Sequence, residues 1–185
     1  MNTVQPIRSN DVIRQVLRAA SGMGKKPYLL MTIGFNTGLR ISDILRLRVC
    51  DIRAEAITLT EKKTGKRQRI EMNPVALADA RRVTADCAEN ELLFPSPQTV
   101  RLGQPIDYTT AYLWVNRACR AAGIKGPVGC HTMRKTFGYH FYKTSGGDVA
   151  LLMGRFKHAN QVETLRYIGV DEERINNVAK KMRLG

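Results

Sequence analysis

A single pair of alternating segments interrupts a sequence whose apolar residues otherwise recur at helical spacing, and this interruption sets the fold class. Residues 56–60 and 67–72 alternate between apolar and polar side chains, as strands do when one face is buried. Between them, the segment Lys63-Thr64-Gly65-Lys66 has the composition of a turn. The sequence therefore predicts a mostly α protein with a small antiparallel β-hairpin (α+β), whose tip is basic.

Helix signals lie on both sides of this hairpin. Ser9, Asn10 and Asp11 are residues that cap helix starts, and apolar residues follow them at helical spacing. Pro27 suits the first turn of a second helix, and Gly38 suits the residue that ends it. We expect helices at about residues 9–21, 27–36, 42–47, 74–89, 107–122, 132–143, 148–156, 162–168 and 171–183.

Nothing in the sequence divides the chain into parts. It has no internal repeat, no low-complexity stretch and no linker-like segment, and 185 residues suit one domain. We therefore expect residues 1–185 to form a single domain with a core large enough to fold without disulfides.

The chain is strongly basic. It has 30 Lys and Arg against 16 Asp and Glu, which gives a formal net charge of +14. A folded chain this basic usually faces a polyanion, because each neutralised phosphate releases a counterion. A solvated basic surface is the alternative, but the charge balance favours a nucleic acid partner.

The sequence favours a cytoplasmic protein without membrane contact. The first six residues lack the apolar region of a signal peptide, and the longest apolar stretch, residues 28–35, is too short to span a bilayer. No two cysteines form a C-x-x-C pair, so neither a zinc knuckle nor a dithiol redox site is indicated. We expect reduced, mostly buried thiols at Cys50, Cys87, Cys119 and Cys130.

Three segments carry residues suited to chemistry on a phosphate. The first is T-G-L-R-I-S-D at residues 37–43, and the second is C-H-T-M-R-K-T-F at residues 130–137. The third is L-L-M-G-R-F-K-H at residues 151–158, which Tyr167 follows nine residues later. Arginine suits a phosphate because its planar fork binds two oxygens and never loses its charge. A tyrosine hydroxyl can act as a nucleophile when a neighbouring group takes its proton.

In this order, the motifs resemble those of the tyrosine recombinase, or phage integrase, family. That family has one arginine in T-G-L-R-x-S-[DE], a second in H-x-x-R, and a histidine or tryptophan shortly before a nucleophilic tyrosine. A lysine on a β-hairpin lies between the two arginine segments. All of these elements occur here between Arg40 and Tyr167. The resemblance implies a tyrosine recombinase catalytic domain.

The resemblance implies a catalytic set of Arg40, Lys63, His131, Arg134, His158 and Tyr167. Arg40 and Arg134 would bind the non-bridging oxygens of the scissile phosphate, and Asp43 would orient Arg40. Tyr167 would attack phosphorus, the hairpin lysine would protonate the leaving 5′-oxygen, and the two histidines would complete the pocket. The remaining histidine, His140, is given a structural role.

This set implies chemistry without a metal. Two arginines and a lysine carry enough positive charge to stabilise a phosphoryl-transfer transition state. The sequence has no cluster of Asp, Glu and His at metal-ligand spacing. We expect neither a metal nor another cofactor.

The hairpin lysine is the least defined member of the set. Lys62 and Lys66 flank Lys63, and a register slip of one residue reverses which side chains face the site. Further basic residues are candidates for contacts with the DNA backbone, and some of them are solvated surface. The candidates are Arg46, Arg48, Lys66, Arg67, Arg69, Lys135, Lys143, Arg155 and Lys157.

Two features depart from the family pattern. The family commonly has glycine immediately before its third histidine, whereas Lys157 stands there and Gly154 lies further back. Family members also usually carry a separate N-terminal helical domain that closes around DNA, and the residues before Arg40 are too few to form one. We expect a short recombinase without this N-terminal core-binding domain, the other reading being an excised catalytic domain.

The expected function is site-specific DNA recombination, as in integration, excision or resolution, through a 3′-phosphotyrosine intermediate. A type IB-like topoisomerase or telomere resolvase would use the same chemistry. A catalytically inactive DNA-binding regulator is a further alternative, which the intact catalytic set disfavours. Recombination requires synapsis, so the expected partners are double-stranded DNA and other copies of the chain, as a homotetramer on DNA.

The last expected helix, at residues 171–183, has a narrow apolar stripe that needs a partner. One reading is that this helix packs on its own domain. The other, implied by the resemblance, is that it is exchanged onto a neighbouring protomer.

Overall fold

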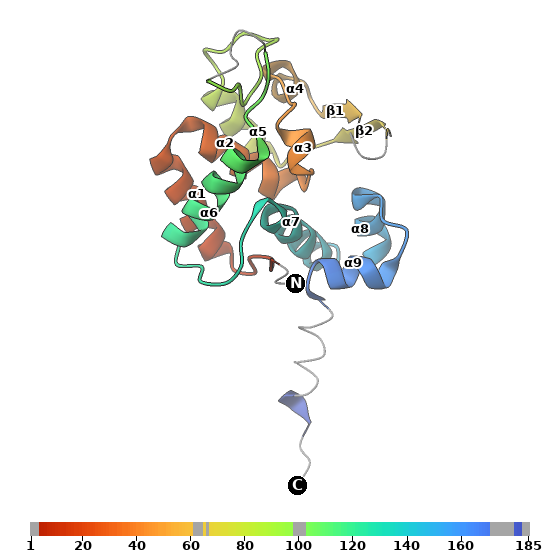
Figure 1. Cartoon of the computed structure of the whole chain (residues 1–185). Helices are drawn as coiled ribbons and strands as arrows, with labels where there is room; N and C mark the ends of the chain where they lie inside the picture. Colours follow the sequence, from red (N-terminus) through yellow and green to blue (C-terminus); the bar gives the residue numbers. More distant parts are fainter. Residues whose placement is uncertain (1–3, 61–64, 66, 98–102, 171–179, 183–185) are drawn as a thin grey trace.

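The computed structural model describes residues 4–60, 65, 67–97, 103–170 and 180–182. The described chain is mostly helical and contains one two-stranded antiparallel sheet, which confirms the predicted fold class (Figure 1). In chain order the elements are α1 (Asn10–Met23), α2 (Lys25–Thr37), α3 (Ile41–Ile44), α4 (Val49–Arg53), β1 (Ile57–Thr60), β2 (Arg67–Ile70), α5 (Pro74–Val83), α6 (Tyr108–Ala121), α7 (Cys130–Thr144), α8 (Val149–Phe156) and α9 (Gln161–Tyr167).

Capping residues set most helix ends where the sequence predicts them. Asp107 accepts a hydrogen bond from the backbone N–H of Thr110 at 2.7 Å and begins α6. Asp148 accepts from the N–H of Leu151 at 3.0 Å and begins α8. Each cap satisfies an N–H group that the first helical turn leaves without a partner. Gly38, with φ 63°, ends α2 in the left-handed conformation that glycine favours.

The hairpin pairs β1 with β2 in antiparallel register, from Ile57 opposite Ile70 to Thr60 opposite Arg67. Ile57 and Ile70 are both buried, so this end of the hairpin anchors in the core. The strands are shorter than predicted, because residues 56, 71 and 72 lie outside the ladder. The buried pair Ile57 and Ile70 holds the hairpin against the rest of the domain.

The largest differences from the predicted helices are the presence of α4 and the end of α5. The short helix α4 was not predicted, and its signal is Asp51, which accepts a hydrogen bond from the N–H of Arg48 at 2.8 Å. Helix α5 ends at Val83 rather than near residue 89. The chain beyond it turns back to pair with the start of α4, where the N–H of Val49 donates to the carbonyl of Glu91 at 2.9 Å. Such tertiary pairing overrides helical propensity.

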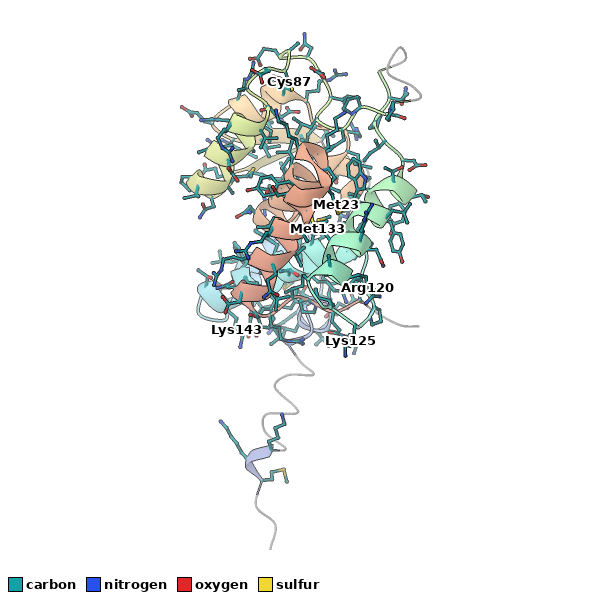
Figure 2. All side chains as sticks on the ribbon, turned by 90° about the vertical axis from the view of Figure 1, so that its left-hand side faces the viewer. Met23, Cys87, Arg120, Lys125, Met133 and Lys143 are labelled. Atoms are coloured by element: carbon teal, nitrogen blue, oxygen red, sulfur yellow. The ribbon has the colours of Figure 1, made fainter. Side chains whose placement is uncertain are left out.

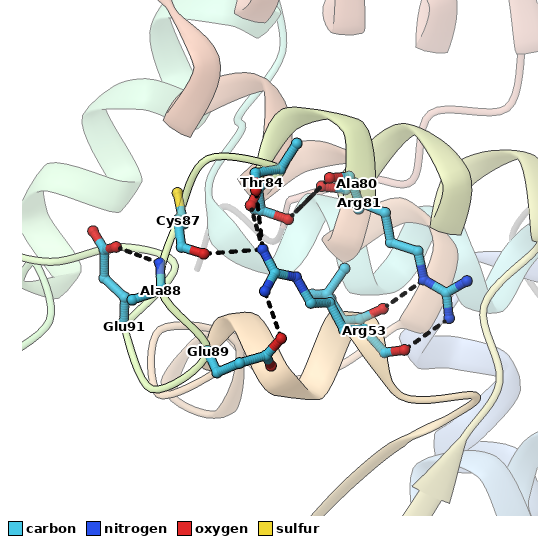
Figure 3. Close-up of polar contacts among 10 residues, drawn as sticks. Arg53, Ala80, Arg81, Thr84, Cys87, Ala88, Glu89 and Glu91 are labelled. Carbon is cyan, nitrogen blue, oxygen red and sulfur yellow. Dashed lines mark hydrogen bonds and ion pairs between the residues drawn. The ribbon is translucent and has the colours of Figure 1, made fainter.

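Two arginines hold the ends of α4 and α5 together (Figure 3). Arg81 on α5 donates to the carbonyls of Ile52 at 3.0 Å and Arg53 at 3.1 Å, which lie at the end of α4. Arg53 in turn donates to the carbonyls of Thr84 at 3.1 Å and Cys87 at 2.9 Å, just beyond α5. Each guanidinium satisfies carbonyls that a helix end leaves without partners. Part of the positive charge therefore maintains the fold.

Helix α7, which lies between α6 and α8 in Figure 1, contributes to two hydrophobic cores. The larger core involves α1, α2, α5 and α6 and includes Met133 of α7, which lies in the interior of the molecule in Figure 2. The smaller core joins Tyr139 of α7 to Leu152 of α8 and Leu165 of α9. A Cβ added at Gly34 of α2 would lie 2.6 Å from the sulfur of Met133, so this glycine permits the close approach of α2 and α7.

The segment before α1 also packs on α7. The N–H of Ile7 donates to Oγ1 of Thr136 at 2.9 Å, and Nε2 of His140 lies 3.0 Å from the carbonyl oxygen of Ile7. His140 thus has the structural role that we expected. Arg8 donates to the carbonyl of Gly169 at 3.2 Å, which ties this segment to the turn after α9.

The cysteines are free thiols, and Cys119 and Cys130 are buried. Burial raises the pKa of each of these two thiols to about 11, so both stay protonated and unreactive. In the described part of the chain, no helix is both long and apolar enough to cross a membrane. The predictions for Lys62, Lys63 and Lys66 fall outside the described residues, as does the helix at 171–183 apart from residues 180–182.

Candidate active site

The start of α7 supplies three residues of the candidate site. Thr132 fixes this start, because its Oγ1 accepts a hydrogen bond from the N–H of Gly129 at 3.1 Å. His131 and Arg134 are three residues apart, and Lys135 follows His131 by four, so all three share one side of the helix. The motif H-x-x-R thus becomes a pair of neighbouring side chains.

Tyr167, the last residue of α9, lies within the site of its own chain. Its hydroxyl oxygen is 3.2 Å from Nδ1 of His131. Its ring meets the rings of Phe156 and His158 edge to face, with centroids 5.9 and 5.5 Å apart. These contacts hold the phenol in place within the site.

Arg134 is buried and joins two loops of the site. Its guanidinium donates to the carbonyl of Gly38, in the loop that carries Arg40, and to that of Phe156 at 3.2 Å, just before His158. The guanidinium carbon also lies 4.0 Å from the centroid of the Phe156 ring. These contacts fix the plane of the guanidinium, which is what recognition of a phosphate by a planar fork requires.

Arg40 stands at the N-cap of α3 with extended backbone angles, φ −69° and ψ 146°, and is half-buried. Its charge reaches the other site residues, since it helps to lower the pKa of His131 and opposes the rise that burial causes in the pKa of Tyr167. Asp43 lies in the same helical turn as Arg40 and is buried. The structure therefore brings Arg40 to the site.

His158 is held from two directions. Its backbone N–H donates to the carbonyl of Met153 at 3.0 Å, and its Nδ1 lies 3.1 Å from Oγ1 of Thr164 in α9. The preceding residue, Lys157, has φ 55° and ψ 40°, the left-handed conformation. Lysine thus adopts here a conformation that glycine adopts at little cost, at the position where the sequence departs from the family pattern.

The electrostatics suit proton transfer from the phenol. Burial lowers the pKa of His131, and the charges of Arg134, Lys135 and Arg40 lower it further, so the imidazole is neutral near neutral pH. Burial raises the pKa of Tyr167, while Arg134 and Arg40 oppose this effect. A neutral imidazole beside a protonated phenol can accept its proton, since the tautomer with a bare Nδ1 presents a lone pair to the hydroxyl.

The structure divides the predicted DNA-contact residues into two groups. Lys135 does not fit the prediction, because it is buried under the ring of Tyr167 rather than exposed on the surface. The guanidinium of Arg155 donates a hydrogen bond to the carbonyl of Thr37, and the carbonyl of Arg155 accepts one from the side chain of Gln68 at 3.0 Å. Arg155 therefore links α8 to α2 and to the hairpin. Exposed positions are held by Arg46, Arg48, Arg67, Arg69, Lys143 and Lys157.

Sequence reasoning missed three residues that contact the catalytic set. They are Lys135 and Phe156 against Tyr167, and Thr164 against His158. A signal for Lys135 was available, since its spacing of four from His131 places it on the same helix face. Nothing local marked Phe156 or Thr164, because their contacts come from the packing of α8 and α9. Within the described ranges, no group of three or more His, Cys, Asp or Glu is placed to hold a metal ion.

This fold and site correspond to a known class. A sequence profile of the phage integrase family matches residues 8–174, and the chain belongs to that family. It is therefore a tyrosine recombinase, an enzyme of site-specific recombination. The comparisons give no support to the topoisomerase, telomere resolvase or inactive regulator alternatives.

Among named proteins, the chain is 40% identical over 174 residues to the probable integrase/recombinase YoeC of Bacillus subtilis, covering 94% of this chain and 93% of that protein. It is 26% identical to the tyrosine recombinase XerC of Caldanaerobacter subterraneus, covering 91% of this chain but 48% of XerC.

Solved structures share the fold. The crystal structure of XerA recombinase matches 98% of this chain and 67% of its own, with a TM-score of 0.73 and 21% identity. The XerH site-specific recombinase bound to palindromic difH substrate, in a post-cleavage complex, matches 97% of this chain and 54% of its own, with a TM-score of 0.75 and 20% identity.

Proposed function

We propose that this recombinase cleaves and rejoins DNA strands with Tyr167 as its nucleophile. The observation that carries the proposal is the phenol hydroxyl 3.2 Å from Nδ1 of His131, within reach of the charges of Arg134 and Arg40. A nucleophile, a base and two fixed cations are the parts that phosphoryl transfer needs.

In the cleavage step, the hydroxyl oxygen of Tyr167 forms a bond to phosphorus as the bond from phosphorus to the 5′-oxygen breaks. His131 accepts the phenolic proton, and the leaving 5′-oxygen takes up a proton from Lys63. The product is a 3′-phosphotyrosine and a 5′-hydroxyl. Rejoining is the reverse reaction with another strand, and it needs no outside energy because the covalent link conserves the phosphodiester.

The other members of the set position and neutralise the phosphate. Arg40 and Arg134 would bind the two non-bridging oxygens, where negative charge builds up in the transition state. Asp43 would orient Arg40 from one helical turn away. His158, held by Thr164, would complete the pocket. These charges supply the stabilisation that a metal ion supplies in other phosphoryl-transfer enzymes, so we expect activity to persist in EDTA.

Double-stranded DNA is the partner that this chemistry requires, and we expect the enzyme to act in the cytoplasm. The exposed basic residues Arg46, Arg48, Arg67 and Arg69, near or on the hairpin, would contact the phosphate backbone. The charge of +14 supports this role. The XerH site-specific recombinase shares this fold and has been solved bound to its palindromic difH substrate, which supports DNA as the partner.

Synapsis implies several copies of the chain on DNA, and we propose a homotetramer in which the expected C-terminal helix, at about 171–183, docks on the neighbouring protomer. A head-to-tail exchange of this kind can close into a ring. Sedimentation of the protein with a two-site DNA would detect a tetramer, and a species with one protein per site at saturating concentration would argue against it.

The experiment that tests the proposal uses nicked suicide substrates carrying a candidate site. Cleavage on such a substrate leaves the protein covalently attached, because the freed fragment diffuses away. Wild type should give an adduct that survives denaturing electrophoresis. Tyr167→Phe should bind DNA normally and give no adduct, because only the hydroxyl is lost.

A matched control is Tyr108→Phe, since Tyr108 is exposed on α6 and its hydroxyl interacts with the thiol of Cys130, which is outside the predicted catalytic set. This variant should form the adduct as wild type does. An adduct in Tyr167→Phe, or mass spectrometry that places the DNA on another residue, would refute the assignment.

A further inference from the structure

Lys135 is a charged residue inside the protein that the proposed cleavage step does not use. Its exposed fraction is 4%, and its Nζ lies 5.0 Å from the centroid of the Tyr167 ring. Burying an ammonium group is costly unless its surroundings compensate for the lost hydration. The aromatic face is one such compensation, because the negative face of the ring attracts a cation.

The position of this ammonium matters more than its burial. Arg134 and Arg40 act on the hydroxyl of Tyr167, the first through a side-chain hydrogen bond and both through their charges. Lys135 instead faces the ring. When the phenol loses its proton, part of the negative charge spreads over the ring, so attraction to a cation at the face increases. The contact is therefore stronger for the phenolate than for the phenol.

We propose that Lys135 is a positioning residue for the nucleophile, which holds the ring of Tyr167 by its face and favours the phenolate during strand cleavage and rejoining. This inference rests on the proposed role of Tyr167. The phenolate is the attacking group in cleavage and the leaving group in rejoining. An interaction that favours it over both the phenol and the phosphotyrosine accelerates both directions and leaves their equilibrium unchanged.

Other titratable or charged groups face Tyr167 as well, and the experiment must hold them constant. From α7 these are His131 and Arg134, from the N-cap of α3 Arg40, and from the loop after α8 His158. Lys135 also contributes to lowering the pKa of His131. Removing the ammonium should therefore raise the pKa of His131 slightly while it raises the pKa of Tyr167.

The test compares Lys135→Met with Lys135→Arg. Methionine keeps an unbranched chain of similar length in the buried site, and arginine keeps the charge. We expect Lys135→Met to cleave about tenfold more slowly than wild type near neutral pH, which corresponds to about 1.4 kcal/mol. Rejoining should slow by a similar factor, DNA affinity should stay unchanged, and the rate should recover as the pH rises. Lys135→Arg should retain most of the activity.

A spectroscopic readout separates electrostatics from packing. In protein labelled with fluorotyrosine, the fluorine resonance that is missing from Tyr167→Phe identifies this ring. Its titration midpoint should rise by about one pH unit in Lys135→Met and return toward wild type in Lys135→Arg.

The outcomes are distinct. If Lys135→Met slows cleavage equally at all pH values without moving the titration, the residue only packs and the proposal is wrong. Unchanged rates in Lys135→Met would also overturn it, provided that wild type forms its adduct on Tyr167. If wild type forms no adduct on Tyr167, the proposed function fails instead.

Discussion

Replacing Lys157 by glycine should stabilise the protein, although glycine usually destabilises. Among the described residues, Lys157 is the one non-glycine with a positive φ, 55°. A residue with a Cβ pays about 1–2 kcal/mol for this left-handed conformation. Glycine avoids that cost but makes the unfolded chain more flexible, which takes back about 0.4–1 kcal/mol. We therefore expect Lys157→Gly to be more stable by about 0.5–1 kcal/mol, or roughly 1–4 °C in Tm.

The matched control is Lys157→Ala, which removes the exposed side chain but keeps the Cβ. Alanine pays the same backbone cost as lysine, so this variant should unfold close to wild type. The difference between the glycine and alanine variants isolates the backbone conformation from any contact of the lysine side chain. Thermal and urea unfolding followed by circular dichroism would measure both. A glycine variant no more stable than the alanine variant would refute the argument.

Two further predictions concern the site. Arg134→Ala and Arg40→Ala should each slow cleavage about a hundredfold or more. Arg134→Ala should also lower the free energy of unfolding by about 2–5 kcal/mol, because the buried carbonyls of Gly38 and Phe156 lose their donor. Arg40→Ala should lower it by less, because Arg40 is only half-buried. Equal losses of stability for the two variants in urea unfolding would contradict this. The pKa of His131 in the folded protein lies below its ordinary 6.5, so as the pH falls the imidazole is protonated in the unfolded chain before it is protonated in the folded one. The contribution of His131 to stability is therefore lost as the pH falls below about 6.5. An NMR midpoint for His131 at or above the ordinary value would be inconsistent with that pKa direction.

Elements fixed by neighbouring residues could be predicted from the sequence, and elements fixed by distant contacts could not. The caps at Asp107 and Asp148 act within three residues, so their helices begin where the pattern indicates. The end of α5 was misplaced because the carbonyls beyond it are held by Arg53, some thirty positions earlier in the chain. No local pattern carries that information.

The same distinction applies to the site. The motifs identified Arg40, His131, Arg134, His158 and Tyr167, and the structure brings these residues together. What the motifs could not convey is how the residues are held. Thr164 against His158 and Phe156 against Tyr167 follow from the packing of α8 and α9. The conformation of Lys157 was likewise hidden, since lysine is not a residue whose presence indicates a left-handed backbone.

The T-G-L-R motif illustrates why such motifs are specific. Gly38 has φ 63°, and a Cβ there would lie 2.3 Å from Cδ1 of Phe137, so both its conformation and its surroundings require glycine. Its carbonyl accepts from Arg134, which also donates to the carbonyl of Phe156. One buried arginine thus joins the loop before Arg40 to the loop before His158. Arg134 thus maintains the fold, and in the proposed function the same residue would bind the phosphate. Its contact with Gly38 links two motifs that lie far apart in the sequence.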